Sequence, residues 1–122
     1  MIGIILNQTS VAVGNALEGQ LCWRADDRRL PDQLSVAIEW ELNTEQPRRL
    51  FGVARHLTWN APADHEVTLP FRLLIPLEGP ISYAGKMLSV RWTIKAAAVM
   101  RYATDETVES EIEVIPRTFT AT

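Results

Sequence analysis

The stretch LPFRLLIPLEGPISYAGKMLSVRWTIKAAA, residues Leu69–Ala98, decides the fold of this chain. Apolar and polar residues alternate at both of its ends, and Ile75-Pro76 and Gly79-Pro80 interrupt the alternation. Proline cannot donate a ladder hydrogen bond, so the first strand should end at Pro76. Pro80 keeps the return path extended, and Gly85 permits a turn into the next strand. The pattern predicts a rigid crossover that joins two strands, from one sheet to the other, as Greek-key sandwiches need.

The same alternation extends outward from this stretch. In residues 34–42 and 88–96, every second side chain is apolar and the residues between them are mostly polar, which places one face of each strand in a core. Further strands are predicted at residues 2–6, 16–24, 49–57, 67–73 and 108–115. Residues 96–103 are interpreted as the continuation of a strand instead of a short helix, because neither a stop signal nor an N-cap precedes them.

Seven such strands, separated by turn residues, predict an all-β fold of about seven or eight strands. The expected architecture is an immunoglobulin-like antiparallel β-sandwich that occupies residues 1–122 as a single domain. The chain is 47% hydrophobic and 22% charged, which provides enough apolar material for one core.

Charge and cysteine content narrow the range of partners. The formal net charge is −3, so general nucleic-acid binding is not expected, and the basic pairs Arg28-Arg29 and Arg48-Arg49 lie in loop-like stretches. The single cysteine, Cys22, excludes an intrachain disulfide and suits a reducing compartment.

The first residues lack the features of a signal peptide, and no apolar run is long enough to span a membrane. A cytoplasmic location is therefore expected.

Several unusual residues of the crossover resemble the arrestin-type domain. The arrangement is Pro70-Phe71, Ile75-Pro76, the loop Pro80-Ile81-Ser82-Tyr83, Gly85-Lys86, and then the strand Val90–Ala96. It is similar to the family's strand end F-x-(F/L)-x-(I/L)-P, loop P-x-S-(F/Y)-x-G and following strand V-x-(Y/W)-x-(V/I)-K-A. The segment Gly14–Leu21 is similar to an upstream motif of the family, without its leading proline.

The resemblance implies an arrestin-like sandwich and a role in protein–protein scaffolding without catalysis. Arrestin-type proteins carry two such sandwiches in tandem, and this chain has the length of one. Their polar core and phosphate sensor map to no residues here, so receptor binding and phosphate sensing are not carried over. A homodimer would supply a second sandwich. Strand addition at an edge such as residues 2–6 or 49–57 would instead make the chain a structural subunit of a homo-oligomeric assembly.

The sequence contains none of the common catalytic motifs, so an enzyme is not expected. The sequence has no G-x-S-x-G, H-E-x-x-H, P-loop or dinucleotide-binding motif, and no cofactor is expected. His56, Asp64, His65 and Glu66 flank one loop, so a metal-binding or ligand-binding sandwich is a lesser alternative, although their spacing is not diagnostic. Cys22 is interpreted as an inert strand thiol.

Carboxylates that share a strand face could suggest a glycosidase pair, but a solvated face is the preferred interpretation. Glu111 and Glu113 are expected to pair across strands with Arg91 and Lys95.

The aromatic residues divide into core and surface candidates. Trp23, Trp40 and Trp92 occupy apolar positions of their strands and are predicted to be buried. Trp59 is predicted in a loop, either as an exposed contact residue or folded back over the end of the core. Tyr83 is interpreted as a plug under the crossover, with a role in partner binding as the alternative. The candidate set for partner binding is Trp59, Asn60, Arg48, Arg49 and Tyr83.

Overall fold

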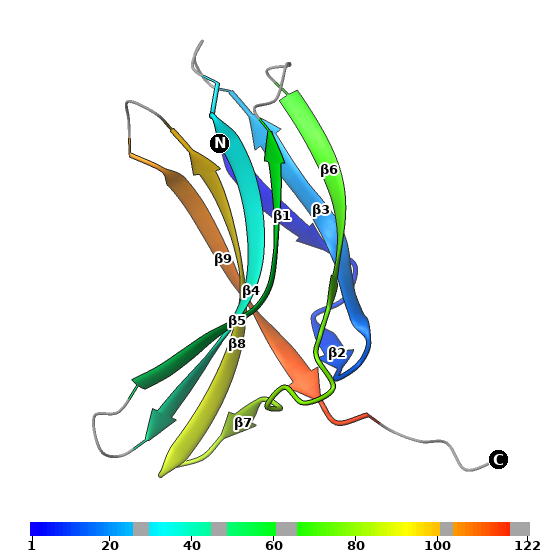
Figure 1. Cartoon of the computed structure of the whole chain (residues 1–122), viewed down its shortest axis with the longest axis vertical. Coiled ribbons are helices and arrows are strands. Elements are labelled where there is room, and N and C mark those ends of the chain that lie inside the picture. The colour runs from blue at the N-terminus through cyan, green and yellow to red at the C-terminus, as the bar shows by residue number, and fades with distance from the viewer. Residues whose placement is uncertain (26–29, 45–48, 61–65, 101–103, 118–122) are drawn as a thin grey trace, which may run out of the picture.

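The computed structural model describes residues 1–25, 30–44, 49–60, 66–100 and 104–117, and it describes residues 49–51, 53 and 54 by their backbone alone. Within these ranges the chain forms nine strands. They are β1 (Ile2–Leu6), β2 (Ser10–Ala12), β3 (Ala16–Arg24), β4 (Gln33–Thr44), β5 (Arg49–Asn60), β6 (Glu66–Leu74), β7 (Tyr83–Ala84), β8 (Leu88–Val99) and β9 (Glu106–Ile115). The strands make two sheets that face each other, as Figure 1 shows.

The strand order confirms the predicted sandwich. The three-stranded sheet has the order β1-β3-β6, and the six-stranded sheet has the order β2-β9-β8-β4-β5, with β7 also paired to β8. Neighbouring strands are antiparallel, as predicted, and the short pair β2 and β9 runs parallel. The sequence pattern missed β2 and β7 because strands of three and two residues are too short to show an alternation.

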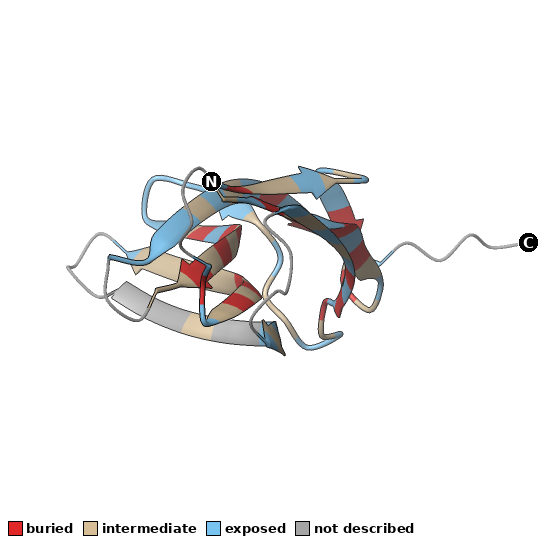
Figure 2. Cartoon of the chain, turned by 90° about the horizontal axis from the view of Figure 1, so that it is seen from above, coloured by how far each residue is buried: buried red, intermediate tan, exposed pale blue. Residues whose placement is uncertain are grey.

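The core lies between the sheets, and its residues follow the predicted alternation. In β4, Leu34, Val36 and Ile38 are fully buried, and they face the same side as the apolar residues of β8 with which they pair. Figure 2 shows buried residues in red, which alternate with intermediate and exposed residues along the ribbons. The three-stranded sheet covers this layer with the side chains of Ile2, Leu17, Leu21, Trp23, Phe71 and Leu73.

Two local features of the strands lie at the alanine-rich end of β8 and in the pairing of β5. The run of alanines continues β8 to Val99, with Ala96 and Ala98 fully buried, as the strand interpretation expected. Residues 101–103 lie outside the described residues. In β5, the pairing register with β4 shifts opposite Ile38 and Glu39, close to Gly52. The indole of Trp40 occupies the space that a side chain at Gly52 would need.

Ion pairs cross the outer face of the six-stranded sheet. Arg91 Nη2 lies 3.1 Å from Glu111 Oε2, as predicted. Lys95 Nζ lies 3.9 Å from Glu109 Oε1 instead of meeting Glu113, because the β8–β9 register places Lys95 directly opposite Glu109. Both pairs are exposed, so each contributes at most about 1 kcal/mol to the free energy of unfolding.

The six-stranded sheet extends beyond the three-stranded sheet at one end. In Figure 1 the lower ends of β4, β5 and β8 splay away from β1, β3 and β6, and β7 lies beside them. The inner face is less buried at this end of the sheet: Trp40 and Leu42 of β4 are only half-buried, whereas Leu34 is fully buried. The opposing sheet therefore leaves part of an apolar inner face without cover.

Candidate protein-interaction site

The crossover from β6 to β7 begins with backbone hydrogen bonds that fix its position. The amide of Ile75 donates to the Asn15 carbonyl at 2.9 Å, and the Ile75 carbonyl accepts from the Gly14 amide at 2.8 Å. The Gly79 amide then donates to the Pro76 carbonyl at 3.1 Å and closes a turn. Because β6 belongs to the three-stranded sheet and β7 pairs with the other sheet, the predicted crossover between sheets is confirmed.

The second half of the crossover is attached to β8 and β9. The indole Nε1 of Trp92 donates to the Pro80 carbonyl at 2.7 Å. Ser82 makes a double contact with Val114, because its amide donates to the Val114 carbonyl and its hydroxyl accepts from the Val114 amide, both at 2.8 Å. These bonds attach the crossover to β8 and β9 and hold the residues that follow Ser82 against the six-stranded sheet.

Replacing Ser82 by alanine should test this attachment. The substitution removes the hydroxyl acceptor of the Val114 amide, and Val114 is only 1% exposed, so water replaces that partner poorly. We expect the free energy of unfolding to fall by about 1 kcal/mol, and the amide of Val114 to exchange faster with solvent. Chemical denaturation and hydrogen exchange measure the two effects, and an unchanged exchange rate at Val114 would contradict the assignment.

A tight hairpin follows the crossover. Tyr83 and Ala84 of β7 pair with Val90 and Ser89 of β8, and the Gly85 amide donates to the Leu88 carbonyl at 3.1 Å. A Cβ atom on Gly85 would lie 2.6 Å from Cε1 of Tyr83, so the predicted need for glycine at this turn has a steric reason.

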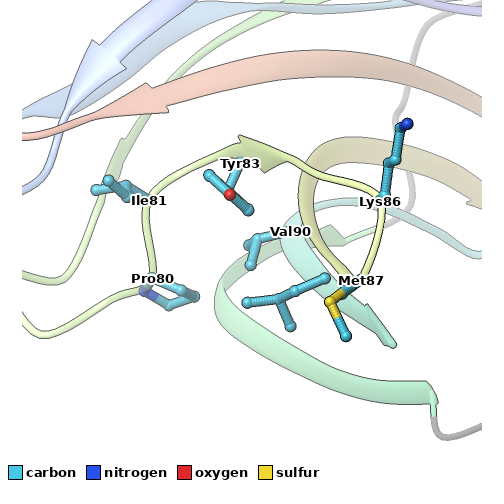
Figure 3. A pocket seen from close by; sticks show the side chains of 7 residues that line it. Pro80, Ile81, Tyr83, Lys86, Met87 and Val90 are labelled. Carbon is cyan, nitrogen blue, oxygen red and sulfur yellow. The ribbon is translucent and has the colours of Figure 1, made fainter. Parts of the chain in front are cut away.

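The hairpin and crossover line an open groove of about 560 Å³. Its walls are apolar except for one lysine, and we call it the hairpin surface; it is formed by Pro80, Ile81, Tyr83, Lys86, Met87, Leu88 and Val90. Figure 3 shows these side chains arranged around the groove, with Pro80 and Ile81 at one end and Lys86 and Met87 at the other. The exposed fractions are 40% for Ile81, 55% for Tyr83, 70% for Met87 and 40% for Leu88.

Register explains why these side chains lie together. Tyr83 is directly opposite Val90, and Val90 is opposite Leu42, so the three lie in one row on the inner face of the sheet. β7, which contains Tyr83, lies where the six-stranded sheet extends beyond the three-stranded sheet (Figure 1). The hairpin surface is therefore the uncovered continuation of the core face.

The structure places the predicted contact residues in different environments. Tyr83 lies on the hairpin surface and is more than half exposed, so it is not buried as a plug under the crossover, and its role in partner binding stays a prediction. Trp59 was predicted in a loop, but it lies in β5 opposite Leu34 and packs half-buried against the core. Asn60 is the exposed last residue of β5. Arg48 lies outside the described residues, and Arg49 begins β5 with its backbone alone described.

The remaining hairpin residues were missed by the sequence analysis, although a signal was present. Met87 and Leu88 are adjacent apolar residues next to a turn, and strand alternation can bury at most one of such a pair. Ile81 likewise precedes the two-residue strand β7, where no alternation could be recognised.

The described residues of the metal-binding alternative are not placed together as ligands of one metal ion. His56 is exposed on β5 opposite Ala37, and Glu66 is the exposed first residue of β6. Asp64 and His65 lie outside the described residues, as do Arg28 and Arg29. In the described ranges, no group of three or more His, Cys, Asp or Glu side chains is placed to hold a metal ion.

Cys22 lies between the buried Leu21 and Trp23 of β3 and is half-buried, as an outward-facing strand position should be. Across the part of the chain that the structure describes, no helix has the length and apolar character needed to cross a membrane.

Comparisons with known proteins bear on the fold. No family model and no curated protein matches the sequence. Among solved structures, the crystal structure of Spo0M, a sporulation control protein from Bacillus subtilis, is similar, with a TM-score of 0.70 and 16% sequence identity. The match covers 95% of this chain and 49% of the Spo0M chain, so this chain spans about half the length of that structure. The likeness shows an arrestin-like β-sandwich, as the crossover motif predicted.

Proposed function

We propose that this chain is a non-catalytic, cytoplasmic protein-interaction domain that acts as an adaptor and binds a protein partner through the hairpin surface. The observation that carries the proposal is the gathering of exposed apolar side chains, with Met87 70% and Tyr83 55% exposed, on one hydrogen-bonded segment. Contiguous exposed apolar patches on small domains mark interaction sites. A tyrosine and a methionine suit such a contact, because one is a rigid amphipathic ring and the other adapts to irregular surfaces.

The attachment of the crossover adds to this support. Hydrogen bonds to Pro80 and Ser82 hold the hairpin before any partner arrives. A surface that is already ordered loses less conformational entropy on binding, so more of the contact energy appears as affinity. The arrestin-like fold fits a regulatory or adaptor domain without requiring a cofactor.

Photo-crosslinking at Ile81 tests the proposal in cells of the native host. Ile81 is replaced by p-benzoylphenylalanine, and we expect discrete crosslinked protein adducts, because this side chain lines the groove. The added substitution Tyr83→Asp should reduce the yield of those adducts at least about tenfold, since it places a charge in the apolar contact. Tyr83 is largely exposed, so the free energy of unfolding should change by less than about 0.5 kcal/mol.

A matched control uses Ile5, which is 56% exposed on β1, outside the hairpin surface. The same probe at Ile5 should not give the adducts seen from Ile81. Identical adducts from both positions, or adducts that persist in Tyr83→Asp, would exclude the hairpin surface as the contact.

Strand addition at β5 is a second candidate, and it would make the chain a structural subunit of a homo-oligomeric assembly. β5 is the last strand in the order of the six-stranded sheet, runs from Arg49 to Asn60 and contains no proline. A long edge strand of this kind offers backbone groups to a further strand. By comparison, Pro70 interrupts β6 at the edge of the other sheet.

A further inference from the structure

Strand β1 forms an open edge of the three-stranded sheet. Just after β1, the Asn7 amide donates to the Glu18 carbonyl at 3.0 Å, in register with the β1–β3 pairing. In an antiparallel ladder every second residue exchanges such bonds, so Gly3 and Ile5 also bond to β3. The residues between them turn their N–H and C=O groups away from β3, and no second strand pairs with β1 in the described ranges. The edge therefore offers the free donors and acceptors of Ile2, Ile4 and Leu6.

β1 also lacks the features that keep most edge strands from pairing. Natural edges carry charged residues or proline on the strand. Pro70 interrupts β6, the other edge of this sheet, and the exposed Arg55 lies on the β5 edge. β1 has the sequence IGIIL, with neither a charge nor a proline, and its Ile5 is 56% exposed. An antiparallel strand can therefore add to β1 without repulsion.

We infer that β1 pairs with β1 of a second copy of this chain, antiparallel across a two-fold axis at Ile4. In this register Ile4 of the two copies face each other and Ile2 faces Leu6, so each free donor of the edge meets a free acceptor. The two three-stranded sheets become one continuous sheet. This contact goes beyond the proposed function, because β1 shares no residue with the hairpin surface.

The outer face of β1 shows why a second copy fits this edge. The two-fold register places Ile5 of each copy directly opposite Gly3 of the other. No atom lies within 4 Å of a Cβ at Gly3, so the space above this residue is open. The row continues to Cys22 of β3, which pairs with Gly3 and is half-buried. Each exposed isoleucine therefore lies over an open glycine, and symmetry makes the two contacts equivalent.

The inner face of β1 adds apolar contact to the same pairing. Ile4 and Leu6 are partly buried and pack against the core, so pairing covers the part of each side chain that remains accessible. An extended segment of another protein can also pair with this edge. The second copy is favoured because it supplies both the exposed isoleucine and the open glycine at matching positions. Two strands of five residues make a small contact, so the dimer should be reversible.

Sedimentation velocity from about 1 to about 500 µM tests the dimer. We expect the wild type to dimerise as its concentration rises. Ile5→Lys should weaken the dimer at least about tenfold, because apolar contact is lost twice in a symmetric pair. Ile4→Pro should abolish dimerisation over this range, since proline removes the central donor. The Ile4 amide points away from β3, so this substitution leaves the β1–β3 hydrogen bonds in place. Ile4→Ala keeps the N–H and should dimerise more strongly than Ile4→Pro.

A disulfide tests the register. In a Cys22→Ser background, Gly3→Cys/Ile5→Cys places two pairs of thiols opposite each other across the two-fold axis. Oxidation of the folded protein should then give a covalent dimer. Ile5→Cys alone in the same background should crosslink at least about tenfold more slowly, because its two thiols are offset diagonally by about 7–8 Å.

Leu74→Lys is the matched control for Ile5→Lys, because Leu74 is 42% exposed on β6, at the other edge of the same sheet. It should dimerise like the wild type, and so should Tyr83→Asp on the hairpin surface. The inference is overturned if the wild type stays monomeric throughout, or if the double-cysteine variant gives no covalent dimer.

A dimer that is unchanged in both Ile5→Lys and Ile4→Pro also overturns the inference and indicates another edge, such as β5. A dimer that is lost in Tyr83→Asp but kept in Ile5→Lys overturns it and assigns the contact to the hairpin surface. If the wild type is monomeric while the probe at Ile81 crosslinks to another protein, the dimer is excluded and the proposed function stands.

Discussion

Replacing Trp92 by alanine should lower the free energy of unfolding by about 3–5 kcal/mol, the largest loss expected from a single substitution in this chain. Trp92 is fully buried, pairs with the residues of β4 and β9 on either side, and donates its indole N–H to the Pro80 carbonyl at 2.7 Å. Alanine leaves a cavity between the sheets and also removes the donor. A chain of this size has few kcal/mol of stability to lose, so the variant should be partly unfolded near 37 °C.

Trp92→Phe separates the two contributions. Phenylalanine keeps most of the apolar ring and loses the N–H, so we expect a loss of about 1–2 kcal/mol together with faster hydrogen exchange in the crossover. Trp59→Phe is the matched control, because Trp59 is half-buried at the end of the same core. Urea unfolding followed by circular dichroism measures all three variants. A loss below about 1 kcal/mol for Trp92→Ala would show that the indole does not support the core as described.

The sequence predicts the parts of this fold in which one rule acts over many residues. Apolar side chains occupy every second position of β8 from Leu88 through Ala98. An alternation of this length predicts a strand with one buried face. The prolines at 76 and 80 were equally informative, because proline removes a backbone donor wherever it occurs. The crossover could therefore be placed between sheets before its hydrogen bonds were known.

The parts that could not be predicted depend on contacts between distant segments. Trp59 is followed by turn residues in the sequence, yet pairing with Leu34 keeps it in β5. Lys95 meets Glu109 because of the β8–β9 register, which the alternation of apolar and polar residues leaves open. The hairpin surface exists because β4, β5 and β8 are longer than the strands of the opposing sheet; the adjacent apolar residues Met87 and Leu88 hint at it, but the extent of cover depends on how the two sheets pack.

Adding a single methyl group at Gly19 should destabilise the fold, because the new atom would meet backbone of the neighbouring strand. Gly19 lies in β3, the middle strand of its sheet, on the same face as Leu17 and Leu21. A Cβ atom there would collide with the backbone carbonyl oxygen of Ile5 and would lie 2.9 Å from Cζ of Phe71. The ring could turn aside, but the carbonyl belongs to the paired strand β1 and can move only if the two strands separate.

We therefore expect Gly19→Ala to lower the free energy of unfolding by about 2–3 kcal/mol, toward the upper end for overpacking. The substitution also restricts the unfolded chain, which favours folding by about 0.4–1 kcal/mol, so the clash must exceed that gain. Gly3→Ala provides the matched control, because no atom lies within 4 Å of a Cβ at Gly3 on the adjacent strand. It should be neutral or slightly stabilising in the same urea titration. Equal effects at the two glycines would show that the approach of β1 to Gly19 does not determine stability.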